Sequence, residues 1–286
     1  MLMKTIKLIS VVVASVLVVL SALSISAQKI SAEELISKHL DSIGPKEKRD
    51  AVKNQLLMGD AQVSFRGSAF VGRGRGLILS ERGKFLLGVK FDSNDYPQDR
   101  FAFDGKKIAI DRPSNGKNRS ILGEFIYNSE ELLTDGLLGG TLSASWALMD
   151  VGSKAKVSYD GSKKIEDVET NVIEYSRKGG SDLTIKIYLD AKTNRHVRTE
   201  YTRIVNAALG ASVDSSAGRS GVTYKLTEDF GDFKKMGDLT LPSLYRIRHS
   251  VSGGASLANR EAVWTFIITD SGYNRELDAN SFDINN

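Results

Sequence analysis

The sequence predicts an α+β protein built mainly from one antiparallel β-sheet, with helices covering one face. Between residues 76 and 110 the apolar side chains fall on every second position, which is typical of strands with one buried face. Residues 85–91 show this alternation most clearly, and it resumes after Asp104-Gly105. Because Asp-Gly between two such runs is a strong hairpin signal, we expect successive strands to pair as hairpins.

The composition is that of a globular protein with a buried core. The chain has 286 residues, enough for one large β domain or two small ones. Charged residues make up 26% and hydrophobic residues 41%. The formal net charge is +4, and without Lys4 and Lys7 the chain keeps 37 Lys and Arg against 35 Asp and Glu. This balance gives no support to nucleic-acid binding.

Residues 1–27 have the pattern of a cleaved secretory signal. Lys4 and Lys7 precede an apolar run at 8–23, and small residues follow up to Ala27. The alternative is an uncleaved membrane anchor, because the run is almost long enough to span a bilayer. We expect cleavage after Ala27 and an exported protein. The chain contains no cysteine, which excludes disulfides, a thiol nucleophile and a lipid on an N-terminal cysteine.

Two helices are predicted at the start of the mature chain. Ser31 and Glu34 form a capping box, and apolar residues recur at helical spacing up to Ile43. Gly44-Pro45 ends this helix, and a second apolar stripe continues to about Met58. Such short helices are marginal alone, so we expect them to lie on the sheet.

Strands are predicted from Gln62 onward, with a glycine-rich run at 72–76. The run Gly-Arg-Gly-Arg-Gly superficially suggests a phosphate-binding loop. A dinucleotide fingerprint needs a strand before it, a helix after it and a different glycine spacing. The strand-like residues 77–79 follow instead, so we predict a bulge or tight turn here.

The segment 122–149 is unusually apolar and is interrupted by Gly136, Gly139 and Gly140. It predicts either a core helix or a lid over an apolar cavity, since hinged segments often contain small residues. Alternating strands resume after Gly152, and the last three are expected at 223–227, 239–249 and 260–269. Residues 207–221, rich in Ala, Ser and Gly, predict a mobile loop. We see no linker or internal repeat, so residues 28–286 are predicted to form one domain.

No catalytic motif stands out. The three histidines, His39, His196 and His249, have no second ligand at metal-binding spacing, so we predict no metal site and expect surface positions for them. The sequence has no Gly-x-Ser-x-Gly elbow, and Asp229-Phe230-Gly231 occurs without the other kinase motifs. We therefore predict a protein without enzymatic activity or cofactor. A secreted hydrolase is an alternative, and it would require a Ser, His and Asp cluster or a metal site in the fold.

Several short motifs resemble the LolA-like family of outer-membrane lipoprotein-sorting proteins. They are Gly76, Leu79-Ser80-Glu81-Arg82 with Phe85, Phe103-Asp104-Gly105-Lys106 with Ile108, Tyr188-Leu189-Asp190 with Arg198, and Gly237-Asp238-Leu239-Thr240-Leu241-Pro242. The similarity spans most of the mature chain. It departs from the family pattern at Gly83, which replaces the usual proline, and at the insertion 207–221.

This resemblance implies an incomplete (half) β-barrel of about 10–12 strands, with the N-terminal and central helices covering an apolar concave face. It implies a periplasmic protein whose cavity accommodates acyl chains. It also implies that Arg82 latches the lid through hydrogen bonds to lid carbonyl groups.

Residues and resemblance together predict a carrier for lipid or lipoprotein acyl chains, with transfer partners in the inner and outer membranes. An alternative is a sensor of the same fold that binds a protein partner. The aromatic and apolar residues of the concave face would line the cavity, although packing against the helices would also explain them. They are Phe65, Phe85, Phe91, Phe101, Phe103, Leu133, Leu137, Trp146, Trp264 and Phe266.

Overall fold

The computed structural model describes residues 30–111, 119–206, 221–253 and 260–284. The predicted leader 1–27 lies outside the described residues, as does the predicted loop 207–221 apart from Gly221. The chain divides into two compact units, Met1–Ser31 and Ala32–Asn286, and all the described helices and strands belong to the second. Within the described residues, no helix is both long and apolar enough to cross a membrane.

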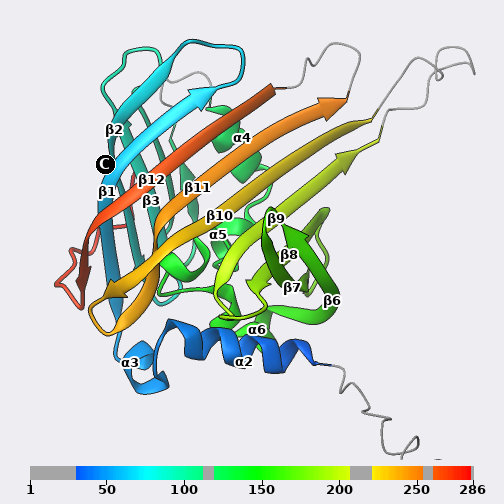
Figure 1. The fold of residues 1–286 in the computed structure, drawn as a ribbon. Coiled ribbons are helices and arrows are strands. Elements are labelled where there is room, and N and C mark those ends of the chain that lie inside the picture. The colour runs from blue at the N-terminus through cyan, green and yellow to red at the C-terminus, as the bar shows by residue number, and fades with distance from the viewer. Residues whose placement is uncertain (1–29, 112–118, 207–220, 254–259, 285–286) are drawn as a thin grey trace, which may run out of the picture. The chain divides into compact units, whose positions relative to one another are not determined.

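The second unit is built on one twelve-stranded antiparallel sheet that is not closed (Figure 1). The order is β5-β4-β3-β2-β1-β12-β11-β10-β9-β8-β7-β6, so the first and last strands pair in the middle and two meanders extend from them. This confirms the predicted fold class. The strands are β1 (Asn54–Phe65), β2 (Val71–Glu81), β3 (Lys84–Phe91), β4 (Gln98–Phe103), β5 (Ile108–Ile110), β6 (Ala155–Ile165), β7 (Val168–Arg177), β8 (Leu183–Asp190), β9 (His196–Val205), β10 (Val222–Met236), β11 (Leu239–Gly253) and β12 (Arg260–Tyr273).

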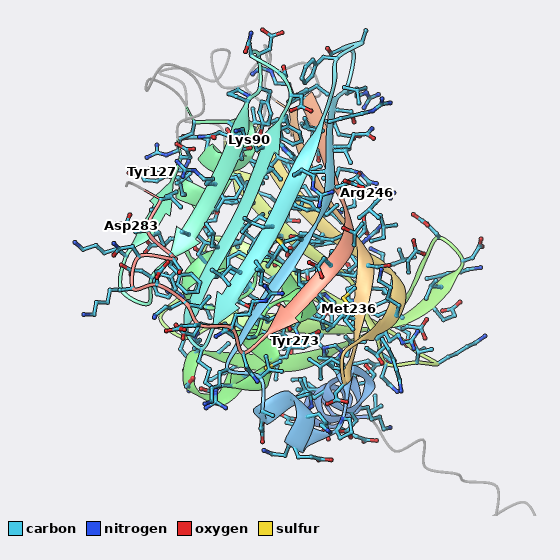
Figure 2. All side chains as sticks on the ribbon, turned by 90° about the vertical axis from the view of Figure 1, so that its left-hand side faces the viewer. Lys90, Tyr127, Met236, Arg246, Tyr273 and Asp283 are labelled. Atoms are coloured by element: carbon cyan, nitrogen blue, oxygen red, sulfur yellow. The ribbon has the colours of Figure 1, made fainter. Side chains whose placement is uncertain are left out.

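One face of this sheet carries the apolar residues, as the alternation predicts. Phe85 pairs with Phe103 and Leu87 with Phe101 across β3 and β4, and both Leu87 and Phe101 are buried. Residues at the alternate positions, such as Lys90 and Arg246, lie on the opposite face (Figure 2). The sheet therefore has one covered side and one side toward solvent.

Short helices cover the apolar face and one end of the sheet. They are α2 (Ala32–Ile43), α3 (Lys46–Asp50), α4 (Ile121–Tyr127), α5 (Glu131–Thr134) and α6 (Val151–Lys154), with 3-10 turns η1 (Gly140–Leu142) and η2 (Ala147–Met149). The predicted extension of the second helix to Met58 is wrong, because β1 already begins at Asn54. Residues 55–58 pair with strands on both sides, β2 and β12, and this pairing outweighs a weak helical pattern.

The glycine-rich run forms neither a bulge nor a turn. Residues 72–76 continue β2 in unbroken register with β1 and β3, which corrects the predicted local structure. The glycines allow close approach: a Cβ on Gly74 would lie 1.9 Å from the Lys90 carbonyl oxygen, and one on Gly76 would lie 2.1 Å from the Phe266 ring. Because Gly74 and Gly76 have no side chains, the backbone of β3 and the Phe266 ring can approach β2 closely here.

The close approach at Gly74 predicts a destabilising substitution. Gly74→Ala should lower the free energy of unfolding by about 1–3 kcal/mol, because the new methyl group meets backbone rather than a movable side chain. Gly88→Ala on β3 is the matched control: its Cβ would meet nothing closer than 3.7 Å. We expect the control to stay within about 0.5 kcal/mol of wild type. Urea unfolding measures both, and equal effects would contradict this explanation.

Candidate functional site

The central segment, residues 121–154, lies inside the curve of the sheet (Figure 1). Ser120 begins α4 by accepting a hydrogen bond at its side-chain oxygen from the Gly123 amide, at 2.9 Å. Gly136 and Gly139, with φ of 77° and 79°, allow the turns that keep the helices short. Leucines from this segment fill the concave face: Leu132, Leu137, Leu138 and Leu142 are fully buried. Of the two predicted roles, the structure shows the leucines of the segment packed in the core, and the lid role stays a prediction.

A buried carboxylate joins the segment to the sheet. Glu228 of β10 accepts a hydrogen bond from the Gly139 amide at 2.7 Å and from the Tyr201 hydroxyl at 2.6 Å. The Tyr245 hydroxyl donates to the oxygen that also accepts from Gly139. These contacts connect the segment with β9, β10 and β11. Sequence reasoning missed Glu228, although its position between Leu226 and Phe230 on the apolar side of β10 is a signal for a buried charge.

The protonation state of Glu228 decides which acceptor is open to the Tyr201 hydroxyl, Glu228 itself or the Leu137 carbonyl oxygen of the segment. Burial raises the pKa of Glu228 to about 7, against its ordinary value of 4.5. The Tyr201 hydroxyl lies 2.6 Å from Glu228 Oε2 and 3.2 Å from the Leu137 carbonyl oxygen. Its single proton can serve one acceptor fully. When Glu228 is protonated, its hydroxyl can donate to Tyr201, which frees the tyrosine proton for Leu137.

Two of the three histidines join the segment to α2 and β9. Trp146 Nε1 donates to His39 Nε2 at 3.0 Å, and the Trp146 ring stacks on the His196 ring at 4.9 Å between centroids. His39 Nδ1 donates to the Asn194 carbonyl oxygen at 3.0 Å, which leaves Nε2 as the acceptor. Burial lowers the pKa of His39 to about 4, so the ring is neutral at pH 7.

The expected surface positions of the histidines are wrong. His39 and His196 are fully buried and His249 is 3% exposed. The spacing of the histidines from other possible ligands carries no information on their burial, because each imidazole ring is covered by elements distant in sequence. Within the described residues, no group of three or more His, Asp or Glu side chains could hold a metal ion.

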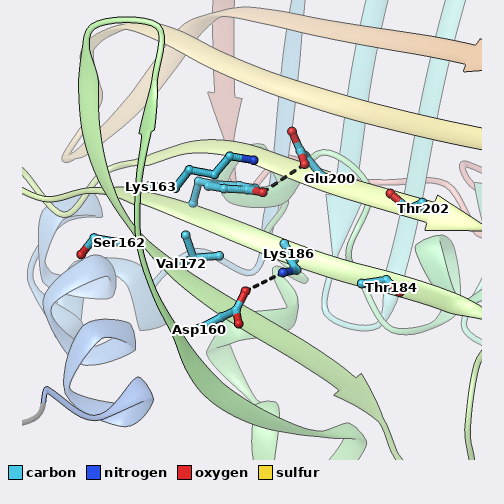
Figure 3. Close-up of a pocket in the computed structure, with 9 residues that line it drawn as sticks. Asp160, Ser162, Lys163, Val172, Thr184, Lys186, Glu200 and Thr202 are labelled. Carbon is cyan, nitrogen blue, oxygen red and sulfur yellow. Dashed lines mark hydrogen bonds and ion pairs between the residues drawn. The ribbon is translucent and has the colours of Figure 1, made fainter.

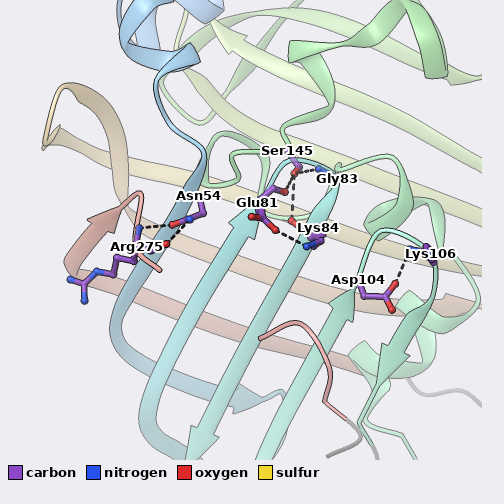
Figure 4. A network of polar contacts seen from close by, with 8 residues as sticks. All are labelled: Asn54, Glu81, Gly83, Lys84, Asp104, Lys106, Ser145 and Arg275. Atoms are coloured by element: carbon purple, nitrogen blue, oxygen red, sulfur yellow. Dashed lines mark hydrogen bonds and ion pairs between the residues drawn. The ribbon is translucent and has the colours of Figure 1, made fainter. Parts of the chain in front are cut away.

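The β2–β3 turn contacts the segment through serine hydroxyls (Figure 4). The Gly83 amide donates to Ser145 Oγ at 2.9 Å, and the Ala144 amide donates to Ser80 Oγ at 2.8 Å. Arg82 lies on the same turn with an exposed side chain, and among the described residues it makes no hydrogen bond to the segment. Its latching role stays a prediction.

The predicted lining residues come together on the concave face, where they pack closely. Phe65, Trp264 and Tyr96 form one aromatic cluster, with ring centroids 5.4–6.4 Å apart. The Phe85 ring lies 3.2 Å from where a Cβ on Gly139 would stand, so segment and sheet are in contact. Phe65 and Phe103 are half-buried, and the other eight are buried: Phe85, Phe91, Phe101, Leu133, Leu137, Trp146, Trp264 and Phe266. Their role in ligand binding stays a prediction.

Two cavities open beside the segment. The base cavity, about 580 Å³, lies between α2, α3, the β2–β3 turn and the segment, and Trp146 and Arg82 are among its lining residues. The mouth cavity, about 270 Å³, lies between α4 and strands β9 to β12. A third cavity of about 310 Å³ is lined by residues of β6 to β9 (Figure 3). There Lys186 pairs with Asp160 and Tyr188 donates to Glu200, so its polar groups bind one another.

Comparison with known proteins gives matches among solved structures alone. No family model matches the chain, and no curated protein matches it. A LolA superfamily protein from Nitrosomonas europaea is 14% identical, covers 90% of this chain and 99% of its own, and superposes with a TM-score of 0.47. A putative outer membrane lipoprotein-sorting protein domain from Vibrio parahaemolyticus is 14% identical, with coverages of 87% and 98% and a TM-score of 0.45. Both carry the description of the family that the motifs resemble.

The raised pKa of Glu228 predicts a pH-dependent stability. The folded protein keeps this proton up to about pH 7, whereas the unfolded chain releases it near pH 4.5. The folded state therefore binds more protons in this window, and the stability that Glu228 contributes falls as pH rises through it. Glu228→Gln stays neutral, and its amide can donate to Tyr201. The free energy of unfolding of the wild type, relative to that of Glu228→Gln, should therefore fall by about 3 kcal/mol between pH 4.5 and 7.

Urea unfolding at several pH values measures this difference. The other buried groups, such as Asp99 with its pKa raised to about 7 by burial and His39, are the same in both proteins, so their contributions cancel. Parallel stability curves for the two proteins would contradict the assignment.

Proposed function

We propose that this protein is exported to the periplasm and carries lipid or lipoprotein acyl chains on its concave face, with the central segment as a lid. The observation that carries the proposal is an apolar, aromatic sheet face covered by a segment of short helices. Acyl chains would replace the leucines of the segment against Phe85, Phe101 and Phe266. Each methylene group removed from water contributes about 0.8 kcal/mol, so a partly buried chain already supplies useful affinity.

The way the segment is attached supports a lid. It leaves the sheet after β5 and returns at β6, and its longest helix, α4, has seven residues. The pairings β4–β5 and β6–β7 that flank it involve only strands, so lifting the segment breaks no strand pairing. Lifting it breaks hydrogen bonds that include those at Glu228, Ser80, Ser145 and Trp146, and it exposes the buried leucines of the segment. Opening therefore leaves the strand pairing intact, and its main cost is the exposure of buried apolar surface, which an incoming acyl chain would cover again.

A second candidate is a sensor that binds a protein partner. The edge strands β5 and β6 favour it, because each pairs with one neighbour only and could accept an added strand. Native mass spectrometry with lipid extraction, on protein purified from its own host, separates the two. Co-purifying fatty-acyl species would support the carrier. A lipid-free protein that stays unchanged after incubation with host lipids and lipoproteins would favour the sensor.

A disulfide across the lid contact tests the mechanism. Ser80→Cys with Ala144→Cys puts thiols on two neighbouring residues, since the Ala144 backbone amide now donates to the Ser80 hydroxyl at 2.8 Å, and the chain has no other cysteine. The oxidised double variant should take up a fluorescent long-chain fatty acid at least about tenfold more slowly than wild type, because the lid cannot lift. The same variant after reduction is the matched control and should recover. Equal uptake by the oxidised and reduced forms would rule out lid opening.

A further inference from the structure

The mouth cavity combines apolar walls with positive charge. Ile121 and Phe125 of α4 and Val251 of β11 supply apolar surface, and Arg203 of β9 and Arg260 of β12 supply guanidinium groups. The remaining lining residues are Glu124, Asn128, Tyr224 and His249. Glu124 lies 3.7 Å from Arg119 and accepts a hydrogen bond from the Asn128 side chain. The one acidic side chain of the cavity lining is therefore already paired.

Arg203 lies in the wall of this cavity, and part of its guanidinium group makes no hydrogen bond to the described residues. The residue is 9% exposed, and its guanidinium carbon lies 5.5 Å from the Phe125 ring centroid and 5.3 Å from that of Tyr224. Nη1 donates to the Asn128 carbonyl oxygen at 2.7 Å, but the buried Nε has no hydrogen-bond partner among the described residues. The nearest carboxylate, Asp182, is 3.9 Å away with a 65% exposed side chain, so the pairing is weak.

His249 presents a second unsatisfied group. It is 3% exposed, and neither ring nitrogen has a hydrogen-bond partner among the described residues. Its ring packs edge-on against Phe125 at 5.2 Å. Burial and the charge of Arg203 lower the pKa of His249 to about 4, so the ring offers one N–H donor at pH 7. Buried polar groups nearly always have partners, so two adjacent side chains with unpaired nitrogens among the described residues make this cavity suited to a ligand that accepts hydrogen bonds.

We propose that the mouth cavity binds the phosphate or carboxylate headgroup of an amphiphile, with Arg203 and His249 donating hydrogen bonds to the anion. Phe125 and Val251 contact the first carbons next to it. At about 270 Å³ the cavity is smaller than sites that enclose a whole drug-sized ligand. It therefore takes the headgroup, and the chain of the amphiphile runs under the central segment.

This assignment rests on the proposed function, because it places the rest of the ligand on the concave face. Binding of a headgroup in this cavity would also affect the lid directly, because lid residues line the cavity. Phe125 belongs to α4, the first helix of the segment, and the Asn128 carbonyl oxygen just after α4 is the acceptor for Arg203. A headgroup that binds Arg203 would thus contact the end of the lid that leaves the sheet after β5.

Calorimetric titration of the full chain tests the proposal with three probes: dodecyl phosphate, dodecanol and inorganic phosphate. Dodecyl phosphate should bind at least about tenfold more tightly than dodecanol, since it adds charge-assisted hydrogen bonds to the same chain burial. Arg203→Gln should remove this difference while leaving dodecanol binding unchanged. Arg246→Gln, on the opposite face of β11, is the matched control and should keep the difference.

Other results of these titrations would overturn the headgroup site, the carrier function or both. Equal binding of dodecyl phosphate and dodecanol, or an unchanged preference in Arg203→Gln, would overturn the headgroup site and leave the carrier function intact. No binding of either amphiphile would overturn both. Inorganic phosphate binding as tightly as dodecyl phosphate would show a free-anion site instead. If Arg203→Gln fails to fold by circular dichroism, Arg260→Gln at the exposed rim provides the test, with a reduced preference expected.

Discussion

Glu228 carries a buried carboxylate that accepts hydrogen bonds from the central segment and from two neighbouring strands. Its oxygens accept hydrogen bonds from the Gly139 amide and from the Tyr201 and Tyr245 hydroxyls, so one side chain joins the central segment to the sheet. A carboxylate is costly to bury, and this network is what makes its position tolerable.

The strand order explains why the central segment covers the concave face of the sheet. β5 and β6 follow each other along the chain but lie at opposite edges of the sheet. The residues between them must therefore cross the whole width of the concave face. An apolar segment in this position covers the aromatic residues of the sheet, and its glycines keep it from forming one long rigid helix. The covering of the concave face follows from the topology.

The candidate site could be predicted from the sequence only in part. Alternation along the strands located the aromatic face, including Phe85, Phe101 and Trp264. The polar contacts were missed: His39 and His196 were expected on the surface but lie in the core, and Glu228 and Arg203 were not singled out. These residues lie on the buried faces of their helix or strands. Their roles depend on the group that each one contacts, and that group is distant in the sequence.

By itself, the sequence determined the antiparallel class, the hairpins and the apolar, glycine-broken segment, because side-chain alternation and turn residues are local properties. Only the tertiary structure decided that residues 54–58 form a strand and that the segment fills the concave face. The deciding contacts join residues far apart, such as Gly139 with Glu228, 89 positions away, and His39 with Trp146, 107 positions away. Such pairings depend on how the whole sheet curves, which no local pattern encodes.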